Sequence, residues 1–399
     1  MRRILFWASV LTVLCTYLLF PLLVLVRALV RPRPHASADI RPSVSMVIAA
    51  HNEAAGIGAK LENVLSLDYP PDRLEVVIAS DGSDDGTDEI VQRYVDRGVR
   101  LLSLPRQGKA PALNAAVRAA RGEILVFSDA NSLYAQDAIA ALMRPFADPL
   151  VGGVAGDQRY VADGAGDAIA AGEQRYWNVD RMLKTAESRA GNVISATGAI
   201  YAVRRSLVRP VPDGVTDDFF TSTGVIAQGY RLVFAPDAVA FEPVARSAEL
   251  EFGRKVRVIT RGLRGVVLRR ELLYPRRHGF YAVQLFGHKV LRRLMVFPLV
   301  VAAATSPLLW RHGRIYRVAT VLQAGVYGLG ATGMLLARRP LGRRKALVFP
   351  AFFCFVNVAA LKATWNVLRG RRIDRWEPRR EPGHTAADAR GVAPARGRN

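Results

Sequence analysis

The stretch Val44-Ser-Met-Val-Ile-Ala-Ala50, followed directly by His51-Asn-Glu53, is a short apolar run that stops at polar residues. Such a run predicts a buried strand, and the apolar positions of residues 57–65 predict a helix after it. The same alternation continues to residue 128, with further strands predicted at 74–79, 100–104 and 123–128 and helices at 87–97 and 111–120. Repeated strand–helix units predict an α/β fold with a Rossmann-like, mainly parallel, doubly wound sheet.

Polar side chains stand where these predicted strands end: Glu53 after the first, Asp81 after the second, and Asp129 and Asn131 after the fourth. Ligands of doubly wound sheets bind beyond the carboxyl ends of the strands, so these residues predict a binding site. Turn composition is the competing interpretation, because Asp, Asn and Gly are common in turns. The first strand is not followed by G-x-G-x-x-G, and no G-x-x-x-x-G-K-[ST] occurs, which disfavours nicotinamide-binding domains and phosphate-loop NTPases.

Asp129 and Asn131 are two residues apart at a strand end, so strand alternation predicts that both side chains reach one cation. Oxygen ligands of this kind suit Mg²⁺ or Mn²⁺, which commonly bridge protein and diphosphate. Lys109 is predicted to add positive charge near the same phosphates. Thr216-Asp217-Asp218 supplies a further carboxylate pair, interpreted either as helix N-caps or, facing a cleft, as the source of a general base.

The composition combines strong basicity with net apolar character. The 399 residues include 56 Lys+Arg and 34 Asp+Glu, a formal charge of +22, yet the mean hydropathy is +0.12. The apolar residues must therefore be concentrated in segments, and disorder throughout is excluded. Nucleic-acid binding is disfavoured, because the Arg residues flank apolar segments where anionic lipid headgroups are the simpler partner. Cys15 and Cys354 both lie in apolar stretches and predict neither a disulfide framework nor a zinc site.

The N-terminal residues 1–30 are predicted to form a transmembrane anchor. Ile4–Val26 is 23 residues long and carries no charge. As a helix it would reach about 34 Å, enough to cross a hydrocarbon core of about 30 Å. A signal peptide is the alternative, but the apolar region is too long and no small-residue cleavage site follows it.

The C-terminal third predicts further membrane segments. Residues 270–293 read as an amphipathic interfacial region, and about three transmembrane helices are expected within 294–368. The positive-inside rule leaves their orientation open, because a single span separates the basic clusters 338–345 and 369–380. Residues 378–399, rich in Pro, Gly, Ala and Arg, are predicted to be a disordered tail.

In this order and spacing, the motifs resemble those of family 2 glycosyltransferases, membrane-anchored inverting enzymes with a GT-A fold that include cellulose, hyaluronan and poly-N-acetylglucosamine synthases. The resemblance covers residues 43–265, the predicted GT-A domain. It rests on Ala49-Ala-His-Asn-Glu53, Asp81-Gly82-Ser83 and Gly108-Lys-Ala-Pro-Ala-Leu-Asn114. The resemblance implies that Ala50, Glu53 and Asp81 line the nucleobase and ribose pocket and that Lys109 approaches the diphosphate.

The remaining family motifs fall in the second half of this region. Asp129-Ala-Asn131 stands at the D-x-D position, with Asn131 in place of the second Asp, and implies a bound Mg²⁺ or Mn²⁺. Thr216-Asp217-Asp218 stands at the T-E-D position, which implies Asp218 as the catalytic base beside Asp217. Arg254-Lys-Val-Arg257-Val258 stands at the Q-x-x-R-W position. The resemblance implies that Arg257 helps to hold the diphosphate leaving group during catalysis and that Arg254 belongs to the donor-binding residues.

The implied activity is a metal-dependent, inverting transfer from a nucleotide-sugar, by resemblance a UDP-sugar, to a polysaccharide or glycolipid acceptor. A multi-pass protein of the cell membrane with a cytoplasmic catalytic domain is implied, with polysaccharide-export proteins as partners. Processive synthesis and single addition both stay open, although Val258 in place of the motif's Trp favours short products. The alternative function is a non-catalytic membrane subunit that keeps the sugar-nucleotide-binding fold for polysaccharide assembly. A transporter is poorly supported, because the largest domain is polar.

Overall fold

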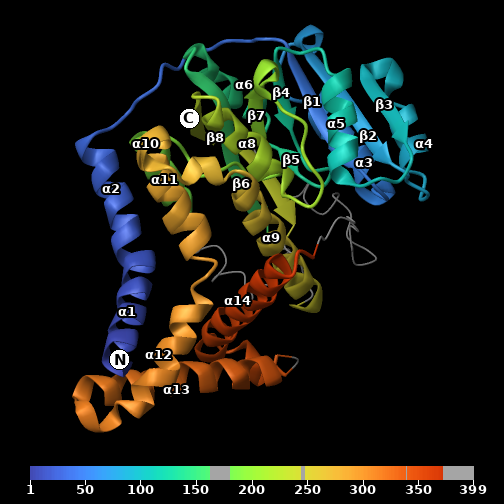
Figure 1. Ribbon diagram of the computed structural model, residues 1–399. Helices are drawn as coiled ribbons and strands as arrows, with labels where there is room; N and C mark the ends of the chain where they lie inside the picture. The colour runs from blue at the N-terminus through green and yellow to red at the C-terminus, as the bar shows by residue number, and fades with distance from the viewer. Residues whose placement is uncertain (162–179, 244–247, 338, 372–399) are drawn as a thin grey trace, which may run out of the picture. The chain divides into compact units, whose positions relative to one another are not determined.

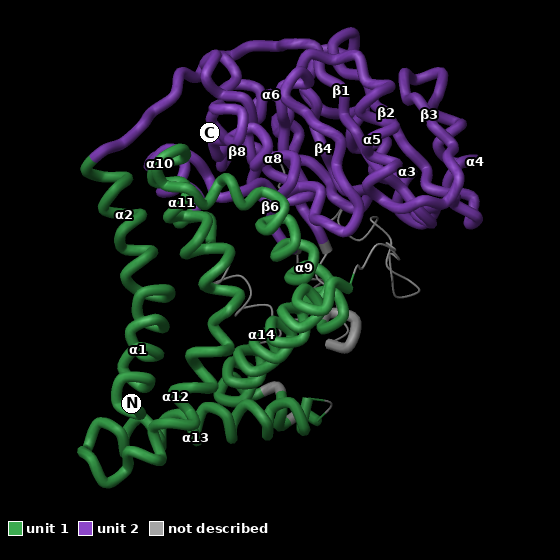
Figure 2. The backbone as a smooth tube through the Cα atoms, in the orientation of Figure 1, with its two compact units in different colours: residues 1–30, 164–183, 245–373 green, residues 31–163, 184–244, 374–399 purple. Residues whose placement is uncertain are grey.

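The structure is a computed structural model that describes residues 1–161, 180–243, 248–337 and 339–371. The chain divides into two compact units (Figure 2). Unit 1 comprises residues 1–30, 164–183 and 245–373, and unit 2 comprises residues 31–163, 184–244 and 374–399. The described part of unit 1 is helical, whereas unit 2 contains the sheet (Figure 1).

Unit 2 is built on an eight-stranded sheet in the order β3-β2-β1-β4-β7-β6-β8-β5. Its strands are β1 (Val44–Ala50), β2 (Leu74–Asp81), β3 (Val99–Leu104), β4 (Ile124–Phe127), β5 (Leu133–Tyr134), β6 (Val151–Val161), β7 (Tyr201–Arg204) and β8 (Arg231–Pro243). Strands β3, β2, β1 and β4 are parallel to one another, and β6 is parallel to β8. Strand β7 is antiparallel to β4 and β6, and β5 is antiparallel to β8.

The predicted α/β class is confirmed, and the four predicted strands all exist. The sheet is mixed, because the chain returns beside β4 in the opposite direction instead of by another strand–helix crossover. Strand β1 is buried along its whole length, which explains why six of its seven residues are apolar, Ser45 being the exception. The carboxyl ends of β1, β2 and β4 lie at one edge of the parallel half, as predicted for the binding site.

Helices cover both faces of this sheet. They are α3 (Ala54–Leu65), α4 (Thr87–Gln92), α5 (Lys109–Ala119), α6 (Ala138–Met143), α8 (Asp217–Ala227) and a helix at 180–190, with short 3₁₀ segments at Pro71–Arg73, Val95–Arg97, Arg144–Ala147 and Arg205–Leu207. Met46 and Ile48 of β1 form one core with Ile57 of α3 and Ile139 of α6. Helix α5 contacts β1 and β2, and α8 contacts β6, β7 and β8.

Unit 1 contains the membrane-type helices. Its elements are α1 (Arg2–Leu14), a π-helical turn (Cys15–Leu19), α2 (Phe20–Val30), α9 (Ala248–Leu268), a 3₁₀ turn (Arg270–Leu273), α10 (Pro275–His278), α11 (Phe280–Leu285), a π-helical turn (Phe286–Leu291), α12 (Val296–Leu308), a 3₁₀ turn (Trp310–His312), α13 (Arg314–Leu335), a 3₁₀ turn (Pro340–Arg343) and α14 (Lys345–Leu368). The first π-helical turn precedes Pro21, whose missing N–H and bulky ring disturb the α-helical pattern.

Three helices in the described residues are long and apolar enough to cross a membrane: Arg2–Val30, Arg314–Leu335 and Lys345–Leu368. A fourth candidate is the pair Phe280–Leu291 and Val296–Leu308, which is bent by 60°. These helices indicate association with a membrane. They correspond to the predicted anchor and C-terminal segments, and part of the predicted interfacial region belongs to the bent pair.

The division between units differs from the predicted domain range of 43–265. The described part of unit 2 ends at residue 243, and α9 groups with unit 1 because it packs along α14. Phe252 of α9 makes an edge-on contact with Phe355 of α14, with ring centroids 5.2 Å apart. The predicted disordered tail at 378–399 lies outside the described residues.

Candidate functional site

The loops that follow β1 and β2 are joined by hydrogen bonds. The Asn52 side chain donates to Asp84 (Nδ2–Oδ1 2.7 Å) and accepts from the Asp84 N–H at 3.0 Å. The Glu53 N–H donates to Thr87 Oγ1 at 2.8 Å. Asn52 has φ 54°, a left-handed conformation that asparagine tolerates better than most residues. The turn therefore places Glu53, which is 3% exposed, at the start of α3.

Asp81, the last residue of β2, holds the loop that precedes α5. Its carboxylate accepts the Gln107 N–H at 2.7 Å and the Gly108 N–H at 2.9 Å, and it pairs with Arg106. Gly82 has φ 62°, and a Cβ there would lie 2.8 Å from the Arg106 nitrogen, so this close approach requires glycine. Because the Asp81 carboxylate is only 1% exposed, contact with a nucleobase would require some of these bonds to exchange.

Lys109 is the first residue of α5 and lies between two carboxylates. Its Nζ is 2.7 Å from Asp129 Oδ1 and 3.1 Å from Asp217 Oδ2. Burial opposes the charge on Lys109, but Asp129 and Asp217 outweigh burial and raise its pKa above the ordinary lysine value. The lysine therefore stays charged and bridges the end of β4 to the start of α8.

The acidic pair of α8 occupies the first helical turn. Thr216 is the N-cap residue, and no side-chain cap hydrogen bond accompanies it. Asp217 and Asp218 are helical residues, so neither is the N-cap that one interpretation of the sequence expected. Both carboxylates are half-buried, and Lys109 offsets part of the negative charge that they and Asp129 bring.

Tyr201, on β7, is a further polar group beside this acidic pair. Its ring stacks on Phe127 of β4 with centroids 4.7 Å apart. Burial raises the pKa of the Tyr201 hydroxyl well above its ordinary value, and the charges of Asp217 and Asp218 add to that effect. The hydroxyl therefore remains protonated next to the carboxylates at any ordinary pH.

The donor set fits a divalent cation that arrives with a substrate. Asn131 is half-buried in the turn after Asp129. In the described part of the chain, no group of three or more His, Cys, Asp or Glu residues is placed to hold a metal ion. Mg²⁺ is commonly held by one or two carboxylates together with substrate phosphates. Asp129 and Asn131 would supply the protein ligands, and the phosphates of the substrate would supply others. The Lys109 ammonium already shows that a cation is stable between Asp129 and Asp217.

The structure brings most of the predicted residues to one edge of the sheet. Asp81 binds the N–H of Gly108, and the next residue, Lys109, binds Asp129 and Asp217, so one continuous segment connects the three carboxylates. Ala50 is fully buried at the end of β1. The predicted donor-binding residues Arg254 and Arg257 lie on α9 in unit 1, and their assignment stays a prediction.

Two residues that touch this site carry no recognisable signal in the sequence. Lys60 lies on the apolar face of α3 and is fully buried beneath the turn after β4. Gly198 packs against Asp129 so closely that a Cβ at residue 198 would lie 2.7 Å from Asp129 Oδ2. Neither residue belongs to a sequence motif that is typical of a binding site. Their contacts with the turn can be seen only in the folded chain.

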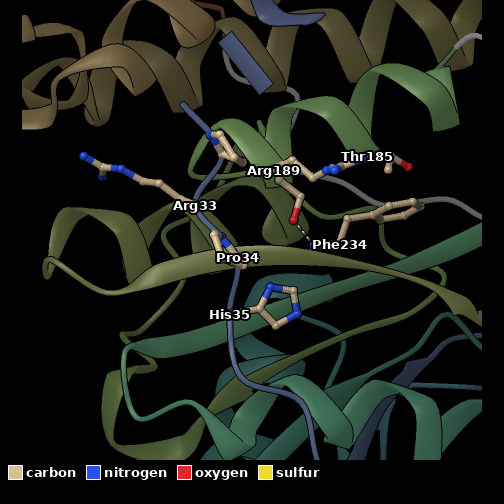
Figure 3. A pocket seen from close by; sticks show the side chains of 8 residues that line it. Arg33, Pro34, His35, Thr185, Arg189 and Phe234 are labelled. Atoms are coloured by element: carbon tan, nitrogen blue, oxygen red, sulfur yellow. Dashed lines mark hydrogen bonds between the residues drawn. The ribbon is translucent and has the colours of Figure 1, made fainter. Parts of the chain in front are cut away.

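Unit 2 also contains a separate pocket of about 410 Å³ (Figure 3). The walls include Arg33 and His35 from the segment after the N-terminal helix, Arg189 from helix 180–190, and Phe234 from β8. Arg231 fixes that segment by donating to the carbonyl oxygens of Arg33 and Pro34, at 2.7 and 2.8 Å. None of the acidic residues at the strand ends lines this pocket, so it is distinct from the candidate site.

Residues 45–211 match the family described as Glycosyl transferase family 2, which confirms the resemblance seen in the motifs. The chain is 26% identical over 223 residues to a protein named poly-beta-1,6-N-acetyl-D-glucosamine synthase from Staphylococcus aureus (strain COL), covering 54% of this chain and 53% of that protein. It is 25% identical over 244 residues to a probable glycosyltransferase, YdaM, of Bacillus subtilis (strain 168), covering 57% of each. The chain thus spans about half the length of the curated relatives it matches.

A solved structure resembles a larger share of the chain. It is titled mannosyltransferase PcManGT from Pyrobaculum calidifontis in complex with GDP-Man and Mn²⁺. The similarity has a TM-score of 0.69 and 27% sequence identity, and it covers 92% of this chain and 100% of that one. The fold described above is therefore the GT-A fold that the motifs implied.

Proposed function

Because residues 45–211 form a family 2 glycosyltransferase domain, we propose that this chain is a membrane-bound enzyme that transfers a sugar, with inversion, from a nucleotide-sugar to a carbohydrate or lipid-linked acceptor. The observation that carries the proposal is the position of Lys109 between Asp129 and Asp217. The three residues meet at the edge where parallel strands end, which is where α/β sheets bind their ligands. Inverting transfer from a nucleotide-sugar at such a site would use a cation, a positive charge that binds phosphate, and a base.

Lys109 and the Asp129–Asn131 turn would bind the diphosphate of the donor. Lys109 supplies the positive charge, and the oxygens of Asp129 and Asn131 would hold Mg²⁺ or Mn²⁺. When bound, the cation would stabilise the negative charge of the departing nucleoside diphosphate. The Mn²⁺ in the related mannosyltransferase structure supports this assignment. Arg254 and Arg257 are proposed to bind the same leaving group, on the basis of their motif position.

Asp218 would act as the general base that takes the proton of the acceptor hydroxyl. Asp217 is less suited to this task, because its carboxylate is already paired with the Lys109 ammonium at 3.1 Å. Asp217 would instead hold Lys109 in place. A single displacement at the anomeric carbon needs no protein nucleophile, so base, cation and phosphate-binding residues suffice.

The donor nucleotide is to be sought among UDP- and GDP-sugars. The motif resemblance implied UDP, whereas the related mannosyltransferase was solved with GDP-Man. Ala50, Glu53 and Asp81 are proposed to border the nucleotide. Asp81 would also hold the loop before Lys109, because its carboxylate accepts the Gly108 N–H. The candidate spans support a membrane location, and a cytoplasmic position of unit 2 is part of the proposal.

The test compares Asp218→Asn with the wild type in detergent or in membranes. Release of nucleoside diphosphate is followed with UDP- and GDP-sugars, with Mn²⁺ or Mg²⁺ and after chelation. Loss of a general base costs about 10²–10⁴-fold, so the variant should lose nearly all turnover while folding normally. Asp213→Asn, an exposed position just before α8, is the matched control and should keep wild-type rates.

Equal rates for Asp218→Asn and the wild type would remove Asp218 from the base role. If the wild type binds a nucleotide-sugar but turns over none of the donors, the non-catalytic assembly subunit becomes the better function. Wild-type rates after chelation would remove the divalent cation from the mechanism.

A further inference from the structure

Lys60 is a buried amine directed at the turn that follows β4. Its side chain lies on α3 and has no exposure to solvent. Its Nζ donates to Ser128 Oγ at 2.7 Å and to the Ser132 carbonyl oxygen at 2.5 Å. It also lies 4.1 Å from the centre of the Tyr134 ring, in range of a cation–π interaction.

The two hydrogen-bond partners of Lys60 bracket the turn that carries Asp129 and Asn131. Ser128 is the residue before Asp129, and Ser132 is the residue after Asn131. A single amine therefore holds both ends of a three-residue turn from its buried side. Because the amine binds the Ser128 hydroxyl before the turn and the Ser132 backbone carbonyl after it, it restricts where Asp129 and Asn131 can point.

Asn63, three residues further along α3, reinforces the same contact. Its Nδ2 donates to the Tyr134 carbonyl oxygen at 2.9 Å, and its Oδ1 accepts the Tyr134 N–H at 2.7 Å. Residues three apart on a helix share a face, so Lys60 and Asn63 together attach α3 to residues 128–134. The turn is thus anchored by specific polar contacts as well as by apolar packing.

Burial of an amine is costly unless its donors are satisfied. The charges of Asp129 and Glu242 favour the protonated form of Lys60, although burial has the larger effect and lowers its pKa to about 7. Glu242 also accepts a hydrogen bond from the Ser132 hydroxyl at 2.5 Å. The network around Lys60 therefore offsets part of the cost at the place where the turn needs support.

We propose that Lys60 is a positioning residue, which holds Asp129 and Asn131 in the arrangement that binds the cation and diphosphate of the donor. The role of the turn rests on the proposed function, whereas the support that Lys60 gives to the turn does not. Lys60 would touch neither the donor nor the acceptor. Its effect would be pre-organisation, since a site built on a fixed turn does not pay to order that turn on binding.

The experiment replaces Lys60 by Met, which keeps the length of the side chain and removes its donors. Amide hydrogen exchange of the full chain in detergent should become at least about tenfold faster in residues 128–134, with little change in β1 or β2. Binding of Mn²⁺ together with UDP or GDP, measured from the free Mn²⁺ resonance signal, should weaken by about tenfold, which is the loss of about one well-placed hydrogen bond.

Val64→Ala is the matched control, because Val64 is a fully buried residue of α3 that packs in the apolar core and has no side-chain donor for the turn. It should lower thermal stability without singling out residues 128–134. If the two variants change exchange in the same uniform way, Lys60 is only a core residue and the proposal is wrong.

Ser128→Ala provides a second, milder variant in case Lys60→Met does not fold. Removing this one partner should accelerate exchange in the same segment by a smaller factor, and unchanged exchange there would overturn the proposal. If wild-type chain binds neither nucleotide with Mn²⁺, the proposed function fails, while the exchange measurement still decides whether Lys60 holds the turn.

Discussion

Lys109 Nζ lies 2.7 Å from Asp129 Oδ1, so the lysine at the start of α5 occupies the carboxylate that the proposed function assigns to a divalent cation. The same ammonium reaches Asp217 at 3.1 Å. Lysine and a divalent cation would therefore compete for carboxylate oxygens until a diphosphate arrives. Under the proposed function, Lys109 would then pair with the phosphate, and Asp129 would be available to hold the cation.

This competition predicts two opposite effects of Lys109→Met. Mn²⁺ should bind more tightly to the nucleotide-free chain, because the ammonium no longer neutralises Asp129 and Asp217. Turnover should fall by about 10²-fold or more, because a charge aimed at the leaving group is lost. Manganese binding and release of nucleoside diphosphate are measured on the same preparation. Arg118→Met, an exposed change of equal charge on α5, should alter neither quantity. Unchanged Mn²⁺ affinity in Lys109→Met would contradict the competition.

Gly198→Ala should disturb Asp129 without unfolding the sheet. The added Cβ would lie 2.7 Å from Asp129 Oδ2, closer than real Cβ contacts allow, so the carboxylate must shift. A displacement of about 1 Å in a catalytic group can cost about 10²-fold in rate. We expect a loss of that order in turnover, with Mn²⁺ affinity reduced and thermal stability little changed.

Gly58→Ala serves as the control for this substitution, because a Cβ at residue 58 of α3 would make ordinary contacts, the nearest at 3.7 Å. It should keep wild-type activity. Full activity in Gly198→Ala would show that the position of Asp129 is not critical.

The two lysines of the site predict different pH dependences of stability. Burial lowers the pKa of Lys60 to about 7, against an ordinary value of 10.5. The unfolded chain then binds the proton more strongly than the folded chain, so this residue makes stability rise between pH 7 and 10.5. The pKa of Lys109 is raised instead, so its contribution is fully present below its ordinary value of 10.5 and is lost only above that pH.

Thermal unfolding of the full chain is measured between about pH 6.5 and 10, a range that starts just below the Lys60 pKa of about 7. The measured quantity is the change of thermal stability with pH. Lys60→Met should flatten the rise relative to wild type, whereas Lys109→Met should keep the wild-type slope. A rise that survives unchanged in Lys60→Met would show that other groups cause it.

The parallel half of the sheet could be predicted from the sequence, because each strand there has a local signal: a short apolar run that ends at polar turn residues. The run Val44–Ala50 is apolar except for Ser45, and it ends at His51-Asn-Glu53. The mixed half could not be predicted in this way, because β7 pairs with β4 and β6, strands far from it in the sequence. Periodicity identifies a strand and does not specify its direction relative to a distant partner.

The sequence by itself determined where the charged residues of the family motifs stand: Asp81, Lys109, Asp129 and the pair Asp217-Asp218 can be read without coordinates. The tertiary structure decided how they combine. It placed Asp217 on Lys109, bound Asp81 to the loop before α5, and set Lys60 and Gly198 against the Asp129 turn. The physical reason is that motifs are local, whereas ion pairs and close packing depend on segments that meet only after the chain has folded.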